Sequence, residues 1–248
     1  MRRFFRNFAA KMARIFKFKQ FSMTDEHCGM RIGTDGVLLG AWAGVCAATS
    51  RIADIGAGCG IISLMLAQRT PQAIVDAVEC DAGAAGDAEI NFAASPWQHR
   101  LHLHQCSFAD FRPQAAYDLV VSNPPFFTET LRSPDSTRAV ARHAGELCFD
   151  ALAARCAGGL LAAGGRLAVI LPSTDDDATL LSAAMNRLYP RRHYLVQNSN
   201  GAKPKRSLWE FASDDGPCET ANLTIRNADG SFTEGYCALT HEFHIHIQ

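Results

Sequence analysis

The most unusual chemistry in this sequence lies in "YDLVVSNPPFF", residues 117–127. Its apolar start is typical of a buried strand, which then stops at Asn123, Pro124 and Pro125, followed by Phe126 and a second phenylalanine. Two consecutive prolines remove two backbone donors and hold the chain extended, so carbonyl groups are left without partners in a sheet. A ligand could use those carbonyls. An isolated Pro-Pro pair more often only ends a strand, so the other strand ends decide between these interpretations.

A second candidate is the glycine-rich stretch "DIGAGCG", residues 54–60. Asp54 closes an apolar run, and Gly56, Gly58 and Gly60 form a G-x-G-x-G pattern ahead of a helical one. Glycine is needed where the chain turns sharply and a ligand approaches the backbone without meeting a Cβ atom. The nicotinamide-binding fingerprint is G-x-G-x-x-G, and the spacing here is tighter.

Two acidic residues follow at later strand ends. Glu79 ends "AIVDAVE" about 20 residues after the glycines, where a carboxylate can accept hydrogen bonds from both hydroxyls of a ribose. Asp110, in "FADF", follows the next run and could reach the exocyclic amine of a bound adenine. With the glycine turn and the polar end at Asn123, these acids describe a pocket for an adenosyl group. Each alone is equally consistent with a structural glycine or a surface carboxylate.

The apolar runs predict elements that bring these strand ends together. Short apolar runs alternate with helical patterns from residue 51 onward, which is typical of βαβ units in an α/β, doubly wound and mostly parallel sheet. Ligands of such sheets bind at the carboxyl ends of the strands, where the candidates fall. The expected strands are 51–56, 73–79, 101–106, 117–123 and 165–172, and the expected helices are 60–69, 81–95 and 143–158.

Composition limits the class of protein. The chain has 248 residues, 48% hydrophobic and 20% charged, which fits one main globular domain. Its nine cysteines are odd in number and contain no C-x-x-C pair, so we expect buried thiols in a reducing compartment and no structural zinc. No apolar run is long enough to cross a bilayer. We therefore expect a cytoplasmic monomer without a metal or a membrane partner.

The histidines at the end of the chain do not have metal-binding spacing. The sequence "HEFHIH" lacks the H-E-x-x-H pattern that places two histidines of a helix on one ion. His244 and His246 alternate with isoleucines, which predicts the polar face of a half-buried strand. The same interpretation applies to His102 and His104 in "LHLH".

The formal net charge of −1 hides an asymmetry. Residues 1–24 hold seven basic side chains and no acid, which leaves 17 basic and 25 acidic residues in the remainder. Phe4, Phe8, Met12 and Ile15 recur at helical spacing, so this basic N-terminal arm could be an amphipathic helix on a polyanion, on a membrane surface or on its own domain. A solvated terminus and a translation start further along the chain are the alternatives.

These residues resemble a class I S-adenosylmethionine-dependent methyltransferase that modifies an exocyclic amino nitrogen. The signature is N-P-P-[YF], here Asn123 to Phe126, and it does not separate DNA adenine, RNA adenine, RNA guanine and protein glutamine as substrates. The stretches "FKFKQFSM", "HCGMRIGTDGVLLGAWA", "SNPPFF", "ARH", "KPKR" and "ALTHEFHI" are similar to the bacterial tRNA (adenine-N6)-methyltransferases that act on the adenosine next to the anticodon of a valine tRNA. This similarity runs from about Phe16 to the end. Cys59 stands where many relatives have threonine, and the arm before Ile15 is longer than usual.

The resemblance implies a role for the proline-rich strand end. The side-chain carbonyl of Asn123 and the backbone carbonyl of Pro124 would each accept one N–H of the target amine, so that its lone pair points at the methyl group. Pro125 helps to keep the carbonyl outward, and Phe126 offers a face on which the target base stacks. No general base is needed, because the product can release its proton to solvent.

The resemblance also implies a seven-stranded Rossmann-like sheet, formed by a methyltransferase domain over 25–248 behind the arm at 1–24. Thr34, Asp35 and Gly36 would bind the methionine part of S-adenosylmethionine; the alternative is that Thr34 or Asp35 caps a helix. The expected phosphate contacts for tRNA are Arg142, His143, Lys203, Lys205 and Arg206; the alternative is that these basic groups only form a solvated face.

Two further functions stay open at this point. One is an amino methyltransferase of ribosomal RNA or of protein glutamine. The other is a nucleic-acid-binding relative that keeps the fold without turnover, which the intact Asn123 to Phe126 motif disfavours, since a binder has no need to hold an amine.

Overall fold

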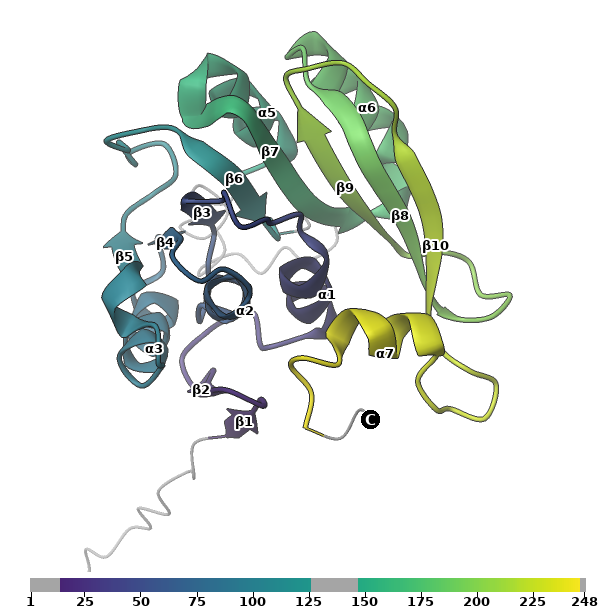
Figure 1. The fold of residues 1–248 in the computed structure, drawn as a ribbon, viewed down its shortest axis with the longest axis horizontal. Helices are drawn as coiled ribbons and strands as arrows, with labels where there is room; N and C mark the ends of the chain where they lie inside the picture. Colours follow the sequence, from purple (N-terminus) through teal and green to yellow (C-terminus); the bar gives the residue numbers. More distant parts are fainter. Residues whose placement is uncertain (1–13, 126–146, 246–248) are drawn as a thin grey trace, which may run out of the picture.

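The computed structural model describes residues 14–125 and 147–245, and its central feature is one eight-stranded sheet (Figure 1). The strand order is β10-β8-β9-β7-β6-β3-β4-β5. All neighbours pair in parallel except β9, which runs antiparallel to both β7 and β8. The strands are β3 Arg51–Ile55, β4 Ile74–Glu79, β5 Leu101–Gln105, β6 Tyr117–Ser122, β7 Leu161–Pro172, β8 Tyr189–Ser199, β9 Arg206–Ala212 and β10 Glu219–Arg226.

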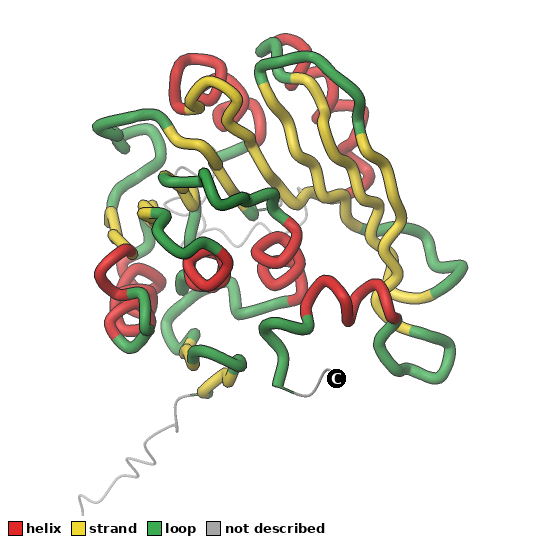
Figure 2. The backbone as a smooth tube through the Cα atoms, viewed as in Figure 1, coloured by secondary structure: helices red, strands yellow, loops and turns green. Residues whose placement is uncertain are grey.

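Helices cover both faces of this sheet (Figures 1 and 2). The α1, α2, α3 and α7 helices share one hydrophobic cluster, which packs on one face, while α5 and α6 share a second cluster on the other. This is the doubly wound arrangement expected from the alternation of apolar runs and helical patterns. The helices are α1 Thr34–Trp42, α2 Ile61–Arg69, α3 Ala82–Ala93, α5 Phe149–Arg155, α6 Asp176–Met185 and α7 Glu234–Thr240.

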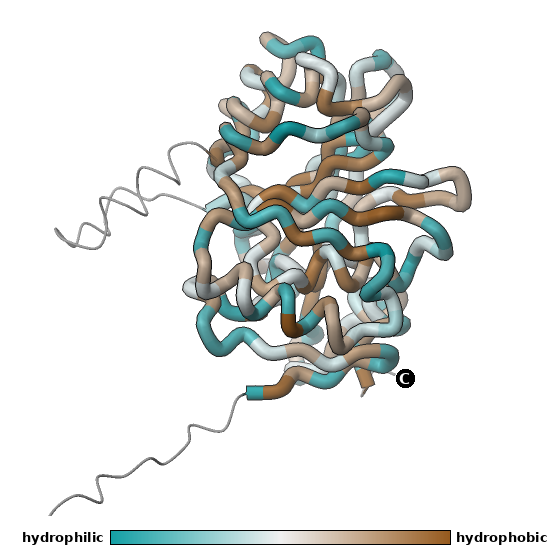
Figure 3. Tube along the Cα trace, turned by 90° about the vertical axis from the view of Figure 1, so that its left-hand side faces the viewer, coloured by the Kyte–Doolittle hydropathy of each residue, from teal (hydrophilic) through white to brown (hydrophobic). Residues whose placement is uncertain are grey.

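The central strands are buried on both faces. Leu119, Val120 and Val121 of β6 are at most 1% exposed, and Ile52, Ala53 and Ile55 of β3 are completely buried. Parallel strands with helices on both sides have continuously apolar sequences, because neither face of the sheet is exposed to water. Figure 3 shows the most hydrophobic stretches crossing the middle of the molecule and hydrophilic stretches at its outer turns.

The predicted fold is confirmed, with differences in detail. The α/β, doubly wound, mostly parallel sheet is present, but it has eight strands where the resemblance implied seven. Its outermost strand, β10, pairs in parallel with β8 over Glu219–Arg226, a segment whose exposed, polar pattern does not stand out as a strand. The β7 strand begins at Leu161, earlier than the predicted 165. Within the predicted helix 143–158, α5 covers Phe149–Arg155 and a π-helical segment follows over Cys156–Leu160, while residues 143–146 lie outside the described residues.

A hairpin precedes the eight-stranded sheet along the chain. The β1 strand, Ile15–Lys17, pairs antiparallel with β2, Ser22–Thr24. Phe18 and Phe21 in the turn between them are buried and stack with ring centroids 4.5 Å apart. The backbone N–H of Lys19 donates to the carbonyl of Phe243, so the hairpin also contacts the end of the chain. Ile15 therefore lies in a strand, while Phe4, Phe8 and Met12 of the predicted helical stripe lie outside the described residues.

The strand predicted at the C-terminal histidines is wrong for His244. Residues 241–245 form turns after α7, and the His244 ring packs between Phe18 and Tyr236, with centroids 6.2 and 6.1 Å away. Alternation of histidine and isoleucine imitates a strand, but residues 241–245 pair with no strand among the described residues. His246 lies outside the described residues.

Candidate active site

A cavity of about 1010 Å³ opens at the carboxyl ends of β3, β4 and β6. The candidate residues predicted from the sequence follow the carboxyl ends of these strands, and parallel strands have their carboxyl ends on the same side of the sheet. Three segments supply most of the wall: the strap before α1, the glycine turn after β3, and the start of α3 after β4. The strap is defined as residues 25–33, which join β2 to α1. Asn123, Pro125 and Leu147 complete the lining.

The glycine turn has backbone angles that favour glycine. The φ angles of Gly56, Gly58 and Gly60 are 73°, 57° and 87°, in the left-handed region that other residues adopt only at a cost. Gly56 and Gly58 line the cavity, whereas Gly60 caps the start of α2. A Cβ atom on Gly60 would lie 2.4 Å from Cε1 of Phe92, so this glycine also permits close packing of the turn against α3.

Asp54 lies beneath the turn and does not line the cavity. Its carboxyl group is completely buried and accepts a hydrogen bond of 2.6 Å from the Ser63 hydroxyl in α2. The other carboxyl oxygen, Oδ1, is buried without a partner among the described residues. Burial raises the pKa of Asp54 to about 7, because the charged form loses its hydration. Its position fits support of the turn better than the predicted contact with a ligand.

Glu79 ends β4 and faces the cavity with an oriented carboxylate. Oε2 accepts the backbone N–H of Gly58 at 2.8 Å, and Oε1 accepts that of Asp81 at 2.8 Å. These two bonds connect the glycine turn to the start of α3. A carboxylate has about four acceptor positions, so two remain for hydroxyl groups in the cavity.

Asn123 brings an acceptor with no partner to the cavity wall. It follows β6, whose last residue, Ser122, donates its hydroxyl to the carbonyl of Ile55 at 2.7 Å and so ties the ends of β6 and β3. The Asn123 Oδ1 atom is buried and has no hydrogen-bond partner among the described residues, while Nδ2 lies 3.9 Å from Sδ of Met30. Pro125 lines the cavity and Pro124 is buried beneath it. Buried acceptors are normally satisfied, so this oxygen is a candidate acceptor for a donor group of a ligand.

The start of α1 lines the cavity beside the strap. Thr34, Asp35 and Gly36 all belong to the lining. The N-cap residue is Gly33, with no side-chain capping bond, so the alternative in which Thr34 or Asp35 caps the helix is wrong. Asp35 instead accepts a hydrogen bond of 2.8 Å from Nε of Arg206, an ion pair across 171 positions of sequence. Arg206, predicted to contact phosphate, thus pairs with Asp35, predicted to contact the cofactor.

Asp110 is not brought to the cavity. It lies in an exposed turn after β5, where its carboxylate accepts the Ser107 hydroxyl at 2.7 Å and its own N–H donates to that hydroxyl at 3.1 Å. Local bonds of this kind are typical of aspartate and serine in turns. Phe126, Arg142 and His143 lie outside the described residues.

The strap carries lining residues that sequence reasoning did not nominate. His27 through Gly33 all face the cavity, although "HCGMRIG" was quoted only for its similarity to relatives. The His27 Nδ1 atom lies 2.9 Å from Oδ1 of Asp87 in α3, and this hydrogen bond to a carboxylate raises the pKa of His27. Nothing in the local pattern indicates this contact, because its partners are 60 positions apart.

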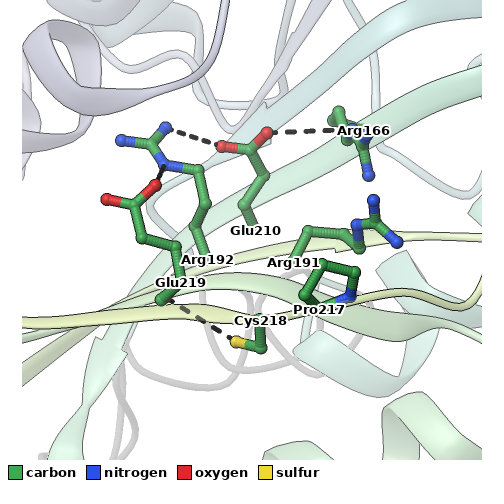
Figure 4. A pocket seen from close by; sticks show the side chains of 7 residues that line it. All are labelled: Arg166, Arg191, Arg192, Glu210, Pro217, Cys218 and Glu219. Atoms are coloured by element: carbon green, nitrogen blue, oxygen red, sulfur yellow. Dashed lines mark hydrogen bonds and ion pairs between the residues drawn. The ribbon is translucent and has the colours of Figure 1, made fainter.

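A second, smaller cavity of about 390 Å³ is lined by residues of β7, β8, β9 and β10 and of the loop before β10 (Figure 4). Figure 4 shows Glu210 between Arg192 and Arg166, with contacts of 2.9 and 4.0 Å. Arg166 and Arg191 also lie 3.8 and 3.6 Å from the carboxylate of Asp214. Positive and negative groups alternate here, so the cluster fits a structural ion-pair network.

The described ranges hold neither a metal-binding cluster nor a membrane-spanning helix. Residues 14–125 and 147–245 contain no group of three or more His, Cys, Asp or Glu side chains that could hold an ion. His102 and His104 of β5 instead flank Asp76, 3.6 and 2.8 Å away. No helix in these ranges has the length and hydropathy of a membrane span.

Solved structures share this fold. A predicted O-methyltransferase from Agrobacterium tumefaciens superposes with a TM-score of 0.64 at 19% identity, covering 84% of this chain and 96% of its own. A ribosomal protein L11 methylase from Lactobacillus delbrueckii gives a TM-score of 0.52 at 17% identity, covering 73% and 78%. The methyltransferase small domain model matches residues 43–190. Fold and site thus define a class I methyltransferase.

Curated relatives narrow the class. A tRNA1(Val) (adenine(37)-N6)-methyltransferase from Phocaeicola vulgatus is 41% identical over 232 residues, covering 94% of this chain and 98% of its own. Proteins of the same name from Aeromonas salmonicida and Cronobacter sakazakii are 40% and 39% identical, each over 93% of this chain and over 97% and 94% of their own. The chain belongs to the tRNA1(Val) (adenine(37)-N6)-methyltransferase family.

Proposed function

We propose that this protein transfers a methyl group from S-adenosylmethionine to the N6 amine of an adenosine in the anticodon loop of tRNA, with valine tRNA as the substrate suggested by its relatives. The observation that carries the proposal is the Oδ1 atom of Asn123 at the wall of the large cavity, which is buried and has no hydrogen-bond partner in residues 14–125 or 147–245. An acceptor there is suited to an N–H donor, and an exocyclic amine has two N–H groups to offer.

The residues of the cavity fit S-adenosylmethionine. Glu79 presents a carboxylate, held by two backbone donors, to the space where ribose hydroxyls would lie. The glycine turn offers backbone without Cβ atoms at Gly56 and Gly58, and the start of α1 supplies Thr34 and Asp35 toward the amino acid part. When bound, the cofactor supplies an electrophilic methyl group on a sulfonium sulfur.

The end of β6 positions the amine. The adenine amine is a poor nucleophile because its lone pair is delocalised into the ring. Asn123 Oδ1 and the Pro124 carbonyl would each accept one of its N–H groups and stabilise the positive charge that develops on nitrogen. The bond from Ser122 to the carbonyl of Ile55 fixes this strand end next to the glycine turn. This bond would help to hold the two acceptors in place before the amine binds.

Basic side chains at the same edge fit an RNA backbone. Arg206 begins β9 opposite Pro172, the last residue of β7, so the loop between β8 and β9 lies at the catalytic edge of the sheet. Lys203 and Lys205 in that loop are exposed. We assign these two lysines to phosphate contacts that position tRNA without reading its sequence. Arg206 contributes through its ion pair with Asp35 to the shape of the cofactor pocket.

The test is methylation of RNA from cells that lack the gene. The protein is incubated with methyl-labelled S-adenosylmethionine and total RNA from a deletion strain, and the labelled nucleoside is identified by mass spectrometry. We expect N6-methyladenosine in one tRNA, next to the anticodon. RNA from the parent strain is the control, since its site is already methylated and should accept little label.

Other outcomes separate the remaining functions. Label in ribosomal RNA would support the ribosomal alternative, and label in a glutamine of added ribosomal or release-factor protein would support the protein alternative. Binding of tRNA without any transferred label would contradict the enzyme and support a binding protein.

A further inference from the structure

One face of α3 contacts the strap along its length. Gly83, Asp87 and Asn91 are spaced four residues apart, so they lie one above another on the same side of the helix. The side chains of Asp87 and Asn91 are polar yet only 1% and 2% exposed. Polar groups buried this deeply need partners, and nearly all of theirs belong to the strap or to the residue before it.

Asp87 holds the middle of the strap. Its Oδ2 atom accepts the backbone N–H groups of His27 at 2.7 Å and of Cys28 at 2.9 Å, while Oδ1 bonds the His27 ring at 2.9 Å. Bonds from backbone donors to a carboxylate are stronger than neutral ones. Asp87 therefore fixes two consecutive peptide groups of a segment that has no regular structure.

Asn91 joins the base of the strap to the glycine turn. Its Oδ1 atom accepts the N–H of Thr24 at 2.8 Å, and its Nδ2 donates to the carbonyls of Thr24 at 2.8 Å and Cys59 at 2.9 Å. Thr24 is the last residue of β2, and Cys59 lies in the turn that lines the cavity. One side chain thus sets the spacing between two walls of the pocket.

Gly83 permits the close approach of the strap. A Cβ atom at this position would lie 3.0 Å from the backbone oxygen of His27 and 3.2 Å from its Cβ. Gly86, three residues on in the same helix, would place a Cβ in open space. Only the glycine facing the strap is therefore required by packing.

The strap depends on these contacts because it buries few side chains of its own. Glu26, His27, Met30 and Arg31 are exposed, and the apolar contacts of the strap with the core are made by buried Cys28 and partly buried Ile32. The hydrogen bonds to α3 therefore add to a small hydrophobic contact. Met30, at the far end, carries the sulfur that lies 3.9 Å from Nδ2 of Asn123, so a displaced strap would alter the catalytic end of the cavity as well.

We propose that Gly83, Asp87 and Asn91 are positioning residues for the cofactor pocket: they hold the strap at the distance from α3 that gives the pocket its width. None of the three touches the reacting atoms. The inference rests on the proposed function only for the identity of the ligand, S-adenosylmethionine.

The two glycines give a matched test. Gly83→Ala and Gly86→Ala both replace glycine by alanine inside α3 and gain helix propensity, which in Gly83→Ala offsets part of the cost of crowding His27, so both variants should remain folded. We expect Gly83→Ala to weaken binding of S-adenosylhomocysteine about tenfold by calorimetry, since a displacement of a fraction of an ångström alters every contact from the strap. Gly86→Ala should bind like wild type. A merely structural role predicts no such separation of affinity from stability.

A second pair tests the carboxylate. Asp87→Asn replaces one acceptor oxygen by a donor, and Glu89→Gln makes the same change at an exposed position of α3. Hydrogen exchange of the protein without ligand should be faster at the strap amides in Asp87→Asn and Gly83→Ala than in the two controls. If Asp87→Asn does not fold, the comparison of Gly83→Ala with Gly86→Ala still tests the positioning role.

The outcomes separate this inference from the proposed function. Equal affinities for Gly83→Ala and Gly86→Ala, or equal exchange of the strap in both, would overturn the positioning role. Failure of the wild-type protein to bind S-adenosylhomocysteine would overturn the proposed cofactor instead, and hydrogen exchange at the strap would still decide the role of α3.

Discussion

At the scale of single residues, the oxygens of Asn123, Glu79 and Asp54 sit in three different environments. The Oδ1 atom of Asn123 has no partner among the described residues. The Glu79 carboxylate accepts two backbone N–H groups and also faces the cavity. The Asp54 carboxyl group is completely buried beneath the glycine turn. Each environment predicts a different consequence of substitution.

Asn123→Ala should affect turnover far more than cofactor binding. The amine loses one of its acceptors in the transition state, so the rate of methyl transfer should fall on the order of a hundredfold or more. Single-turnover kinetics with tRNA, beside calorimetry with S-adenosylhomocysteine, measure the two effects. Near-normal turnover would remove Asn123 from the mechanism.

Glu79→Gln should weaken cofactor binding and also lower stability. The amide keeps one acceptor, so either Gly58 or Asp81 loses its bond, and a hydrogen bond to a charged group contributes about 1.5–3 kcal/mol. The dissociation constant for S-adenosylhomocysteine should rise about tenfold or more, because about 1.4 kcal/mol corresponds to tenfold. Glu89→Gln is the control, and wild-type affinity in Glu79→Gln would refute the ribose assignment.

Asp54→Asn should stabilise the protein at high pH relative to wild type. The folded pKa of Asp54, about 7, is raised above its ordinary value of 3.8, so the folded state binds the proton more tightly than the unfolded state. Wild-type stability should therefore fall as pH rises from about 4 to 7 and stay low above 7. Urea unfolding at pH 5 and pH 8 measures this. If the difference in free energy of unfolding between wild type and Asp54→Asn were the same at both pH values, this prediction would be contradicted.

At the scale of elements, the turn between β3 and α2 depends on conformation and on packing together. Gly60→Ala forces alanine to a φ of 87° and places its Cβ against Phe92. Gly164→Ala imposes similar strain at a φ of 74° with nothing within 4 Å. Strain of this kind costs about 1–2 kcal/mol, and crowding in a packed core adds about 1–3 kcal/mol. Chemical denaturation should show Gly60→Ala as the less stable variant; equal losses would mean that Phe92 moves aside freely.

At the scale of the whole molecule, positive charge is concentrated at the start of the sequence, where residues 1–24 hold seven basic side chains and no acid. Deleting residues 1–13 removes four basic side chains and leaves the hairpin of β1 and β2 intact. If the arm binds RNA phosphates, the Michaelis constant for tRNA should rise. The slope of log affinity against log salt should also flatten, by up to about 0.7 for each phosphate that the arm neutralises, as for single strands. The rate at saturating tRNA and the methylated nucleotide should not change.

Thermal melting separates this from a packing role for the arm. Phosphate contacts predict the same melting temperature for the full-length and truncated proteins. A lower melting temperature with an unchanged salt slope would show that the arm packs on the domain and does not contact RNA.

Local sequence patterns were sufficient to predict the strands at the centre of the sheet, the glycine turn, and the polar ends at Glu79 and Asn123. Apolar runs, glycine spacing and prolines act over a few residues, so they can be interpreted without knowing the fold. The folded chain was needed to show that Asp110 bonds to Ser107 away from the cavity, that Arg206 pairs with Asp35, and that α3 holds the strap. The contacts of Arg206 and of the strap join residues 59 to 171 positions apart, and they depend on how helices pack on the sheet, which no local pattern encodes.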